Sequence, residues 1–274
     1  PGRGAVYLFS GVGANFSSLT LQKELASGSV LGASGSSAFN LKDGDQFGTS
    51  VALEGDLLAI GARHDGTAGK DSGAVYLFKG ASGEDFGGLT LASKLLSNQG
   101  ALNMTDVPEG SGFGTSVALN EGRLAVGAEL ESIGSSKEQG AVYLFSGADA
   151  DFSGVTWEGK MTSATGAENM PTVAAGDHLG SSVGLDGDKL VVGARSDNTS
   201  GAVHMFTNAG TDFSGLSWKG KIGSNAGALG MTGLSANDNF GIAVALNGDQ
   251  LAVGATQDDA SGVINSGAVH LFTN

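Results

Sequence analysis

The sequence predicts an all-β protein, a β-propeller of four-stranded antiparallel blades, and two observations support that prediction. The first is composition, because the 274 residues include 48 glycines but only 3 prolines, and 40% of the chain is hydrophobic. Glycine at this frequency, alternating with Val, Leu, Ala and Phe, is typical of many short strands joined by turns. The second is repetition, because the same strand patterns return in the same order at a period of roughly 66 residues. Repeated four-stranded units that cannot bury their faces alone are typical of propeller blades.

The clearest copy of the repeat lies between Asp45 and Phe78. Its pattern predicts three short strands, at Phe47 to Leu53, Leu57 to Ala62 and Ala74 to Phe78. The connection between the first two strands is short enough to require a tight hairpin. Along the first strand large side chains alternate with small ones, in the sets Phe47, Val51, Leu53 and Gly48, Ser50, Ala52. A sheet with one large-residue face and one small-residue face can stack closely on a copy of itself.

Four strand motifs recur in the same phase along the chain. The first appears as FGTSVAL at Phe47 and Phe113, LGSSVGL at Leu179 and FGIAVAL at Phe240. The second appears as LLAIGA, RLAVGA, KLVVGA and QLAVGA, at Leu57, Arg123, Lys189 and Gln250. The third appears as GAVYLF at Gly4, Gly73 and Gly140, GAVHMF at Gly201 and GAVHLF at Gly267. The fourth appears as LTLQKEL, LTLASKL, VTWEGKM and LSWKGKI, at Leu19, Leu89, Val155 and Leu216. This period favours a propeller over a β-sandwich, and over a solenoid, whose coils usually repeat in about 20 to 30 residues.

We expect a single propeller domain over residues 1–274, with about four repeats. Full repeats are expected at about 45–110, 111–176 and 177–237, and partial ones at about 1–44 and 238–274. Because the chain opens and closes on a third strand, two arrangements are open. Leu19 to Leu25 could supply the fourth strand of the last repeat and close a four-bladed ring, which leaves Gly4 to Phe9 over. Alternatively, the repeats are a segment of a larger propeller or tandem array.

The Phe-Gly of the first strand, the Gly-Ala that ends the second and the GxVYxF third strand resemble the FG-GAP repeat. That repeat builds the propellers of integrin α-subunits and of many bacterial surface proteins. The resemblance covers nearly the whole chain and implies a propeller in an extracellular or cell-surface protein of the bacterial type. The proline of Gly-Ala-Pro is absent, and its place is taken by Arg63, Glu129, Arg195 and Thr256.

A second departure from the FG-GAP pattern concerns calcium. Many members of the family insert a loop of the form DxDxDGxxD between the first two strands. Here that connection is only EGD, NEG, DGD or NGD. Hairpins this short cannot wrap roughly six or seven oxygens around one ion. We therefore expect no cofactor, and calcium remains possible only at some other place.

Charge and composition exclude several classes of function. The formal net charge of −14 argues against nucleic acid, which needs a basic groove or patch. No apolar run is long enough to span a membrane. Without cysteine there is no disulfide framework, thiolate metal site or cysteine nucleophile. An acidic, cysteine-free chain rich in Gly, Ser, Thr and Asn suits a bacterial exterior.

No catalytic motif is present, since HExxH, GxSxG and GxxxxGK[ST] are all missing. Pairs of carboxylates could serve a glycosidase in principle. They fall in turns, where Asp is expected for backbone reasons, at Asp43/Asp45, Asp186/Asp188 and Asp258/Asp259. His204 and His270 stand where other copies have Tyr, which indicates packing. We therefore expect a protein that is not an enzyme.

The loops after Gly-Ala differ most between copies, and variable loops on a regular scaffold often carry binding specificity. The candidate ligand-binding residues on them are Arg63, His64, Asp65, Glu129, Glu131, Arg195, Asp197, Asp258 and Asp259. The alternative is that the loops differ only because solvent-exposed sequence varies without a functional constraint. Trp157 and Trp218 replace leucines in the expected outer strand, where they could stack on a sugar or a protein, or cover the blade edge.

An acidic residue recurs two places before the Phe-Gly position, as Asp45, Asp177 and Asp238, with Ser111 in the remaining copy. Recurrence at one blade position favours a structural role, such as accepting hydrogen bonds from backbone N–H groups. A cation shared by these carboxylates is the weaker alternative.

The leading functional hypothesis is a non-catalytic extracellular recognition or adhesion module that binds a protein or glycan through its inter-strand loops. The second is a structural repeat segment that assembles into a surface layer or filament, because an unpaired end strand invites addition of a strand from a neighbour. The third is a polysaccharide-active enzyme or accessory domain, suggested only by the scattered carboxylates.

Overall fold

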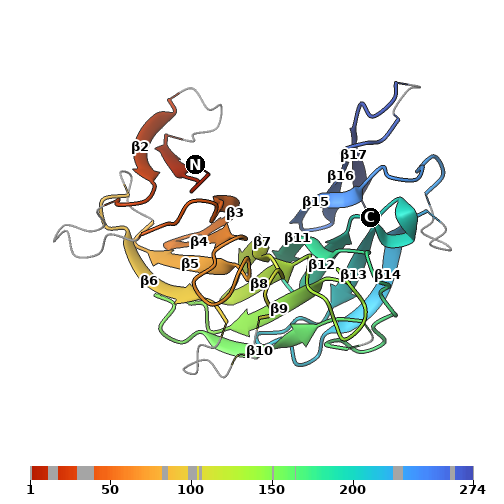
Figure 1. The fold of residues 1–274 in the computed structure, drawn as a ribbon, viewed down its shortest axis with the longest axis horizontal. Helices are drawn as coiled ribbons and strands as arrows, with labels where there is room; N and C mark the ends of the chain where they lie inside the picture. Colours follow the sequence, from red (N-terminus) through yellow and green to blue (C-terminus); the bar gives the residue numbers. More distant parts are fainter. Residues whose placement is uncertain are drawn as a thin grey trace.

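The structure, a computed structural model, describes residues 2–11, 18–29, 40–81, 86–97, 104, 107–149, 151–163, 165–224, 231–259 and 263–273. Within these residues the regular structure is β-strand, apart from one 3₁₀ turn at Asp197–Thr199, and there is no α-helix. The prediction of an all-β propeller is confirmed. The sheets stand side by side along an open arc (Figure 1).

Three sheets are complete blades of four antiparallel strands. The first contains β3 (Phe47–Glu54), β4 (Leu57–Ala62), β5 (Ala74–Lys79) and β6 (Thr90–Leu95). The second contains β7 (Phe113–Asn120), β8 (Arg123–Ala128), β9 (Ala141–Ser146) and β10 (Thr156–Met161). The third contains β11 (Leu179–Asp186), β12 (Lys189–Ala194), β13 (Ala202–Thr207) and β14 (Ser217–Gly223).

Two smaller sheets flank the complete blades. At one end β1 (Val6–Ser10) pairs with β2 (Thr20–Leu25), and these are a third and a fourth strand. At the other end β15 (Phe240–Asn247), β16 (Gln250–Ala255) and β17 (Ala268–Thr273) form what we call the last sheet, with strands one to three of a blade. The two sheets lie at opposite ends of the arc (Figure 1). The sequence left two arrangements open, and since β2 pairs with β1, the one in which Leu19 to Leu25 close a four-bladed ring is not the arrangement of the structure.

The blades stack as the alternation of large and small residues predicts. Each buried cluster combines the small-residue face of one blade with the large-residue face of the next. A Cβ added to Gly184 on β11 would lie 3.6 Å from Val244 and from Leu246 on β15. The core is therefore divided into layers between successive blades, and each layer needs residues from two blades.

The glycines of the repeat motif allow this close stacking. Gly114, the glycine of Phe-Gly, has φ +92°, a conformation that L side chains rarely adopt. A Cβ on Gly61, the glycine of Gly-Ala, would lie 1.9 Å from the Gly114 carbonyl oxygen in the next blade. The two glycines of the motif therefore meet across the blade interface.

Serine hydroxyls on the first strand of each complete blade donate hydrogen bonds to the backbone of the next sheet. Ser50 donates to the Gly114 carbonyl at 2.8 Å, and the same bond recurs from Ser116 to Gly180 and from Ser182 to Gly241. The last sheet has Ala243 at this position. Two of these bonds link complete blades and the third links the third blade to the last sheet, where Ala243 has no hydroxyl to continue the series.

Candidate functional site

The four loops that follow Gly-Ala, residues 63–72, 129–139, 195–200 and 256–266, form what we call the loop face. Residues 260–262 of the last loop lie outside the described residues. Each loop begins where the second strand of a blade (β4, β8, β12 or β16) ends, so the blade stacking brings the first residues of successive loops together.

A cluster of three charges lies at the start of these loops. The Arg195 guanidinium donates through Nε to Glu129 Oε2 at 2.9 Å, and Arg63 Nη1 lies 3.5 Å from Glu129 Oε1. Arg63 also donates through Nε to Gln46 Oε1 at 2.8 Å. Glu129 is buried, whereas the side chains of Arg63 and Arg195 are 33% and 25% exposed. The structure thus joins three residues from three different blades that the sequence predicted only as separate loop candidates.

His178 lies beside this cluster. Its Nδ1 is 3.3 Å from the Glu129 carbonyl oxygen, and its backbone has φ +59°. Burial, followed by the charge of Arg195, lowers the pKa of His178. A neutral imidazole keeps the net charge of the cluster at one positive unit.

Three of the acidic candidates are buried inside their own blades. Asp65 accepts a hydrogen bond from Tyr76 Oη at 2.7 Å and an ion pair from Lys94 at 2.7 Å. The second and third blades repeat this arrangement, with Glu131 between Tyr143 and Lys160 and with Asp197 between His204 and Lys221. We call each group a blade triad. In each complete blade, the carboxylate that was predicted to bind a ligand therefore connects its loop to the third and fourth strands.

The electrostatics of the triads follow from this pairing. Burial alone would raise the pKa of Asp197, but the hydrogen bonds from His204 and Lys221 outweigh it, and the pKa is lowered. The pKa of Asp65 is lowered in the same way, because bonds from Lys94, Thr67 and Tyr76 outweigh burial. Burial and the bond to Asp65 raise the pKa of Tyr76. Asp65 and Asp197 are therefore ionised, and Tyr76 is a neutral donor.

The last sheet carries only part of a triad. Asp258 accepts from His270 Nε2 at 3.0 Å, as Asp197 does from His204. Within the described part of the chain no lysine reaches Asp258. Its neighbour Asp259 accepts from the backbone N–H of Asn265 at 2.8 Å and so shapes the loop.

The remaining loop candidate, His64, lies on the surface of the first loop. Its Nδ1 is 3.3 Å from Asp71 Oδ1, and its side chain is partly exposed. A binding role for His64 stays a prediction.

The recurring aspartates before Phe-Gly accept hydrogen bonds from the backbone. Asp45, Asp177 and Asp238 each accept the N–H of the residue three places earlier, at 2.7, 2.7 and 2.6 Å. The copy with Ser111 has Pro108 at that earlier place, and proline has no N–H to donate. The exception in the series therefore has a physical reason that fits a turn-capping role. Among the described residues there is no group of three His, Cys, Asp or Glu side chains that could hold a metal ion.

The two tryptophans pack against buried clusters. Trp157 on β10 covers the cluster between the first and second blades, and Trp218 on β14 covers the one between the second and third. Both indole Nε1 atoms are buried and lack a hydrogen-bond partner within the described structure. This geometry fits the alternative in which they cover the blade edge.

Comparison with known families agrees with the repeat. The FG-GAP repeat matches residues 37–78, 97–145, 172–206 and 232–272, which together exceed half of the chain. The chain belongs to the FG-GAP repeat family. No curated protein matches the sequence. The FG-GAP propeller is generally a non-enzymatic repeat fold, consistent with a binding or structural module. In the part of the chain that the structure describes, no helix is long and apolar enough to cross a membrane.

The sequence analysis did not identify the lysines of the blade triads in this FG-GAP chain. Lys94, Lys160 and Lys221 stand at the same place in the fourth-strand motif. An acidic residue also stands three places after each Gly-Ala, at Asp65, Glu131, Asp197 and Asp258. This constant spacing from Gly-Ala, inside loops that otherwise vary, could have indicated that the acids stabilise the blade.

Proposed function

We propose that the chain is a non-catalytic FG-GAP recognition module that binds a protein or glycan ligand at the outside of a cell through its loop face. The observation that supports this most is the cluster of Arg63, Glu129 and Arg195. On a chain of net charge −14 it presents two part-exposed guanidinium groups, both held by one buried carboxylate. A chain this acidic does not suit nucleic acid as a partner.

The chemistry of the cluster suits an acidic ligand. Guanidinium groups bind carboxylates through parallel hydrogen bonds, and Glu129 pre-orders both side chains, which lowers the entropic cost of binding. The acidic remainder of the surface repels such a ligand elsewhere and confines it to this place. Uronate-rich glycans and acidic protein loops both carry the required carboxylates.

The test measures binding of the chain to immobilised polygalacturonate and poly-glutamate by interferometry, with a neutral glucan as reference. We expect Arg195→Gln to weaken binding about tenfold, about 1.4 kcal/mol, since one charge-assisted contact is lost. Lys189→Gln is the matched control, because Lys189 begins β12 and Arg195 follows its other end. Equal effects of the two variants, or no binding of the wild type to either acidic probe, would contradict the proposal.

A second candidate is a structural segment that assembles through its end sheets. It is favoured by exposed apolar side chains on both end sheets, with Tyr7 and Phe9 on β1 and Val269 and Leu271 on β17. Light scattering over a range of concentrations separates the two, since a recognition module stays at 27.1 kDa and an assembling segment grows. An enzyme or accessory domain acting on polysaccharide ranks third, because one carboxylate of each candidate pair already accepts a hydrogen bond. Asp186 accepts from the Gly248 N–H, Asp43 from the Arg3 side chain and Asp259 from the Asn265 N–H.

A further inference from the structure

The hairpins between the first and second strands of the blades are hydrogen bonded to one another. They lie at the opposite end of the second strands from the loop face. We number the interfaces along the chain, so that the first lies between the first and second blades and the third between the third blade and the last sheet. In each interface the residue that ends a first strand accepts the N–H of a hairpin residue in the next sheet, in the pairs Glu54 with Glu121, Asn120 with Gly187 and Asp186 with Gly248. The three interfaces are therefore equivalent at this end.

In the second and third interfaces a cationic side chain also crosses to the next hairpin. Arg123, which begins β8, donates through Nη2 to the Gly187 carbonyl. Lys189, which begins β12, donates through Nζ to the Gly248 carbonyl at 2.8 Å. The Arg123 side chain is 2% exposed, and its guanidinium lies 6.0 Å from the centre of the Phe213 ring. The hairpin residue that donates its N–H thus also has its carbonyl bonded by a cation.

The first interface has no such cation, because Leu57 begins β4. The carbonyl in question is that of Glu121, and a leucine side chain has no donor for it. A pocket of about 330 Å³ lies here, and it is lined by Glu54, Asp56, Leu57, Glu121, Gly122, Ala148 and Asp149. Its volume is at the lower end of the range for small-ligand sites, about 300 to 1,000 Å³. The pocket is at the place that the Arg123 side chain occupies in the second interface.

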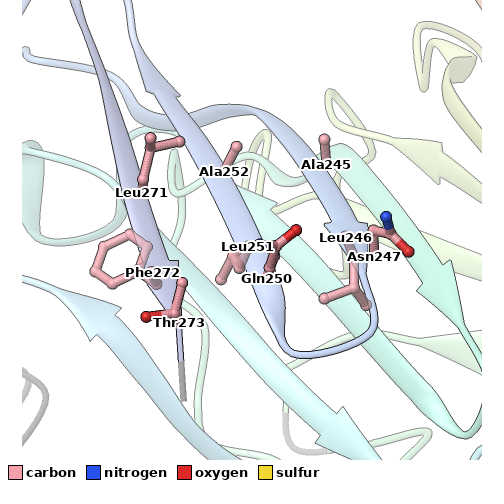
Figure 2. A pocket seen from close by; sticks show the side chains of 9 residues that line it. All are labelled: Ala245, Leu246, Asn247, Gln250, Leu251, Ala252, Leu271, Phe272 and Thr273. Atoms are coloured by element: carbon pink, nitrogen blue, oxygen red, sulfur yellow. The ribbon is translucent and has the colours of Figure 1, made fainter. Parts of the chain in front are cut away.

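The leucine is the exception in the repeat. Figure 2 shows the corresponding hairpin of the last sheet, where Asn247 ends β15 and Gln250 begins β16. The residues that begin the second strands are thus Leu57, Arg123, Lys189 and Gln250, and only the first of them lacks a polar group.

The charges around this place are reversed between the first and second interfaces. Ala148 and Ala209 make the same backbone bond to the hairpins of their blades, which aligns Asp149 with Gly210. Three neutral residues around the Arg123 side chain therefore correspond to acids in the first interface, Asn120 to Glu54, Gly187 to Glu121 and Gly210 to Asp149. The first interface lacks the internal cation and has gained carboxylates instead.

These carboxylates have few cations near them among the described residues. None of the residues that line the pocket is basic. Lys79, at the end of β5, pairs with Asp151 at 3.2 Å. Glu121 Oε2 lies 3.4 Å from Arg123 Nη2, so its side chain is shared with the second interface. A Cβ added to Gly122 would lie 2.1 Å from Asp149 Oδ1, which places that carboxylate directly over the hairpin.

The arrangement of the acceptors suits a guanidinium group better than a metal ion. Within the described part of the chain no three acidic or histidine side chains are grouped so that they could hold a metal ion. A guanidinium presents five donors in a planar fork and so reaches acceptors that stand apart. Leu57 and Ala148, both buried, offer an apolar surface to the alkyl chain that carries the group.

We propose that this pocket, which we call the hairpin pocket, binds the guanidinium group of a ligand, either a small alkylguanidine or an arginine side chain of a protein partner. The group takes the place that Arg123 fills in the second interface and donates to the Glu121 carbonyl and to the carboxylates of Glu54 and Asp149. The site lies at the opposite end of the blades from the loop face and does not depend on the function proposed for that face.

The experiment titrates butylguanidinium into the full ¹⁵N-labelled chain and follows the backbone amide shifts, with butylurea as a neutral probe of the same shape. We expect saturable shifts at Glu121, Gly122 and Ala148 with butylguanidinium and no shift there with butylurea. Asp149→Asn should weaken the affinity at least about threefold, since one charge-assisted bond is lost. Asp188→Asn, the matched control with the same change of charge on the hairpin of the third blade, should leave it unchanged.

A second variant tests the position of the bound group. Leu57→Arg supplies the guanidinium from the chain itself, as Arg123 does in the second blade, and should abolish the binding of butylguanidinium. A melting curve reports whether this variant is folded. The peptide GSRSG and its citrulline counterpart distinguish the two sources, because tighter binding of GSRSG than of butylguanidinium identifies a protein partner and equal binding identifies a small guanidine.

Four results would overturn the proposal. These are equal shifts with butylguanidinium and butylurea, no saturable shift at the hairpin pocket, an equal loss of affinity in Asp149→Asn and Asp188→Asn, and undiminished binding to a folded Leu57→Arg variant. If calcium shifts the same amides and displaces butylguanidinium, the pocket is a metal site and the proposal also fails.

Discussion

The third blade and the last sheet are built from the same strand motifs, yet equivalent residues have opposite environments. Val203 on β13 is 0% exposed, whereas Val269 at the same place on β17 is 68% exposed. A Cβ added at Gly193 would clash with the backbone of the last sheet, whereas a Cβ added at Gly254 would make ordinary van der Waals contacts within its own sheet. The strands form in both cases, so strand formation does not require that both faces of the sheet be buried.

The difference shows that a side chain of a blade is buried by the adjacent blade and by the neighbouring strand, not by its own strand. A blade contributes one half of two interfaces, and its faces become core only when the next blade and its own fourth strand are in place. Stability should therefore be concentrated at the inner interfaces, and matched substitutions in the third blade and the last sheet should differ strongly.

The largest difference is expected for the triad carboxylates. Asp197→Ala leaves Lys221 and buried His204 without their partner, and we expect a loss of about 3–5 kcal/mol in the free energy of unfolding. Asp258→Ala removes one contact to a part-exposed histidine, and we expect about 1 kcal/mol. Urea denaturation of both variants measures the contrast, and equal losses would show that the triad does not stabilise the third blade.

The interface glycines give the next largest contrast. A Cβ at Gly193 would lie 2.0 Å from the Gly241 carbonyl oxygen, and backbone cannot move aside without separating the blades. We expect Gly193→Ala to cost about 3 kcal/mol. At Gly254 the nearest atom is the Ala243 Cβ at 3.4 Å, so Gly254→Ala should change the free energy of unfolding by less than about 0.5 kcal/mol. A similar cost at both positions would mean that the blades do not approach as closely as described.

The smallest effect is in the pH dependence of stability. The pKa of Asp197 is lowered in the fold, so its stabilising contribution is complete above the unfolded value, about 3.9, and is lost as the pH falls through the folded value. The advantage of the wild type over Asp197→Asn should shrink from pH 6 to pH 3. Burial raises the pKa of Asp177, so its cost appears as the pH rises, and Asp177→Asn should gain on the wild type from pH 3 to pH 6. Parallel pH profiles for the two variants would contradict this assignment.

The repeat made the fold predictable, whereas the contacts between blades were not. Strand positions, hairpins and alternating faces follow from local patterns that recur in four copies, so each copy supports the others. The cluster of Arg63, Glu129 and Arg195 joins residues about 66 positions apart, and only the stacking of blades brings them together. The acids after Gly-Ala stay predicted ligand-binding residues, but the sequence reasoning did not use their fixed offset, which would have indicated that Asp65, Glu131 and Asp197 pair with the third and fourth strands of their own blades.

The measurement that tests most directly whether neighbouring blades and strands supply the burial in this protein is hydrogen exchange of the amides of β13 and β17. The account predicts slow exchange throughout β13, which pairs with β12 and β14, and fast exchange of the outward-facing amides of β17, whose pairing among the described residues is with β16. If the β17 amides are protected as strongly as those of β13, the protection of a strand does not depend on its neighbours and the account is wrong.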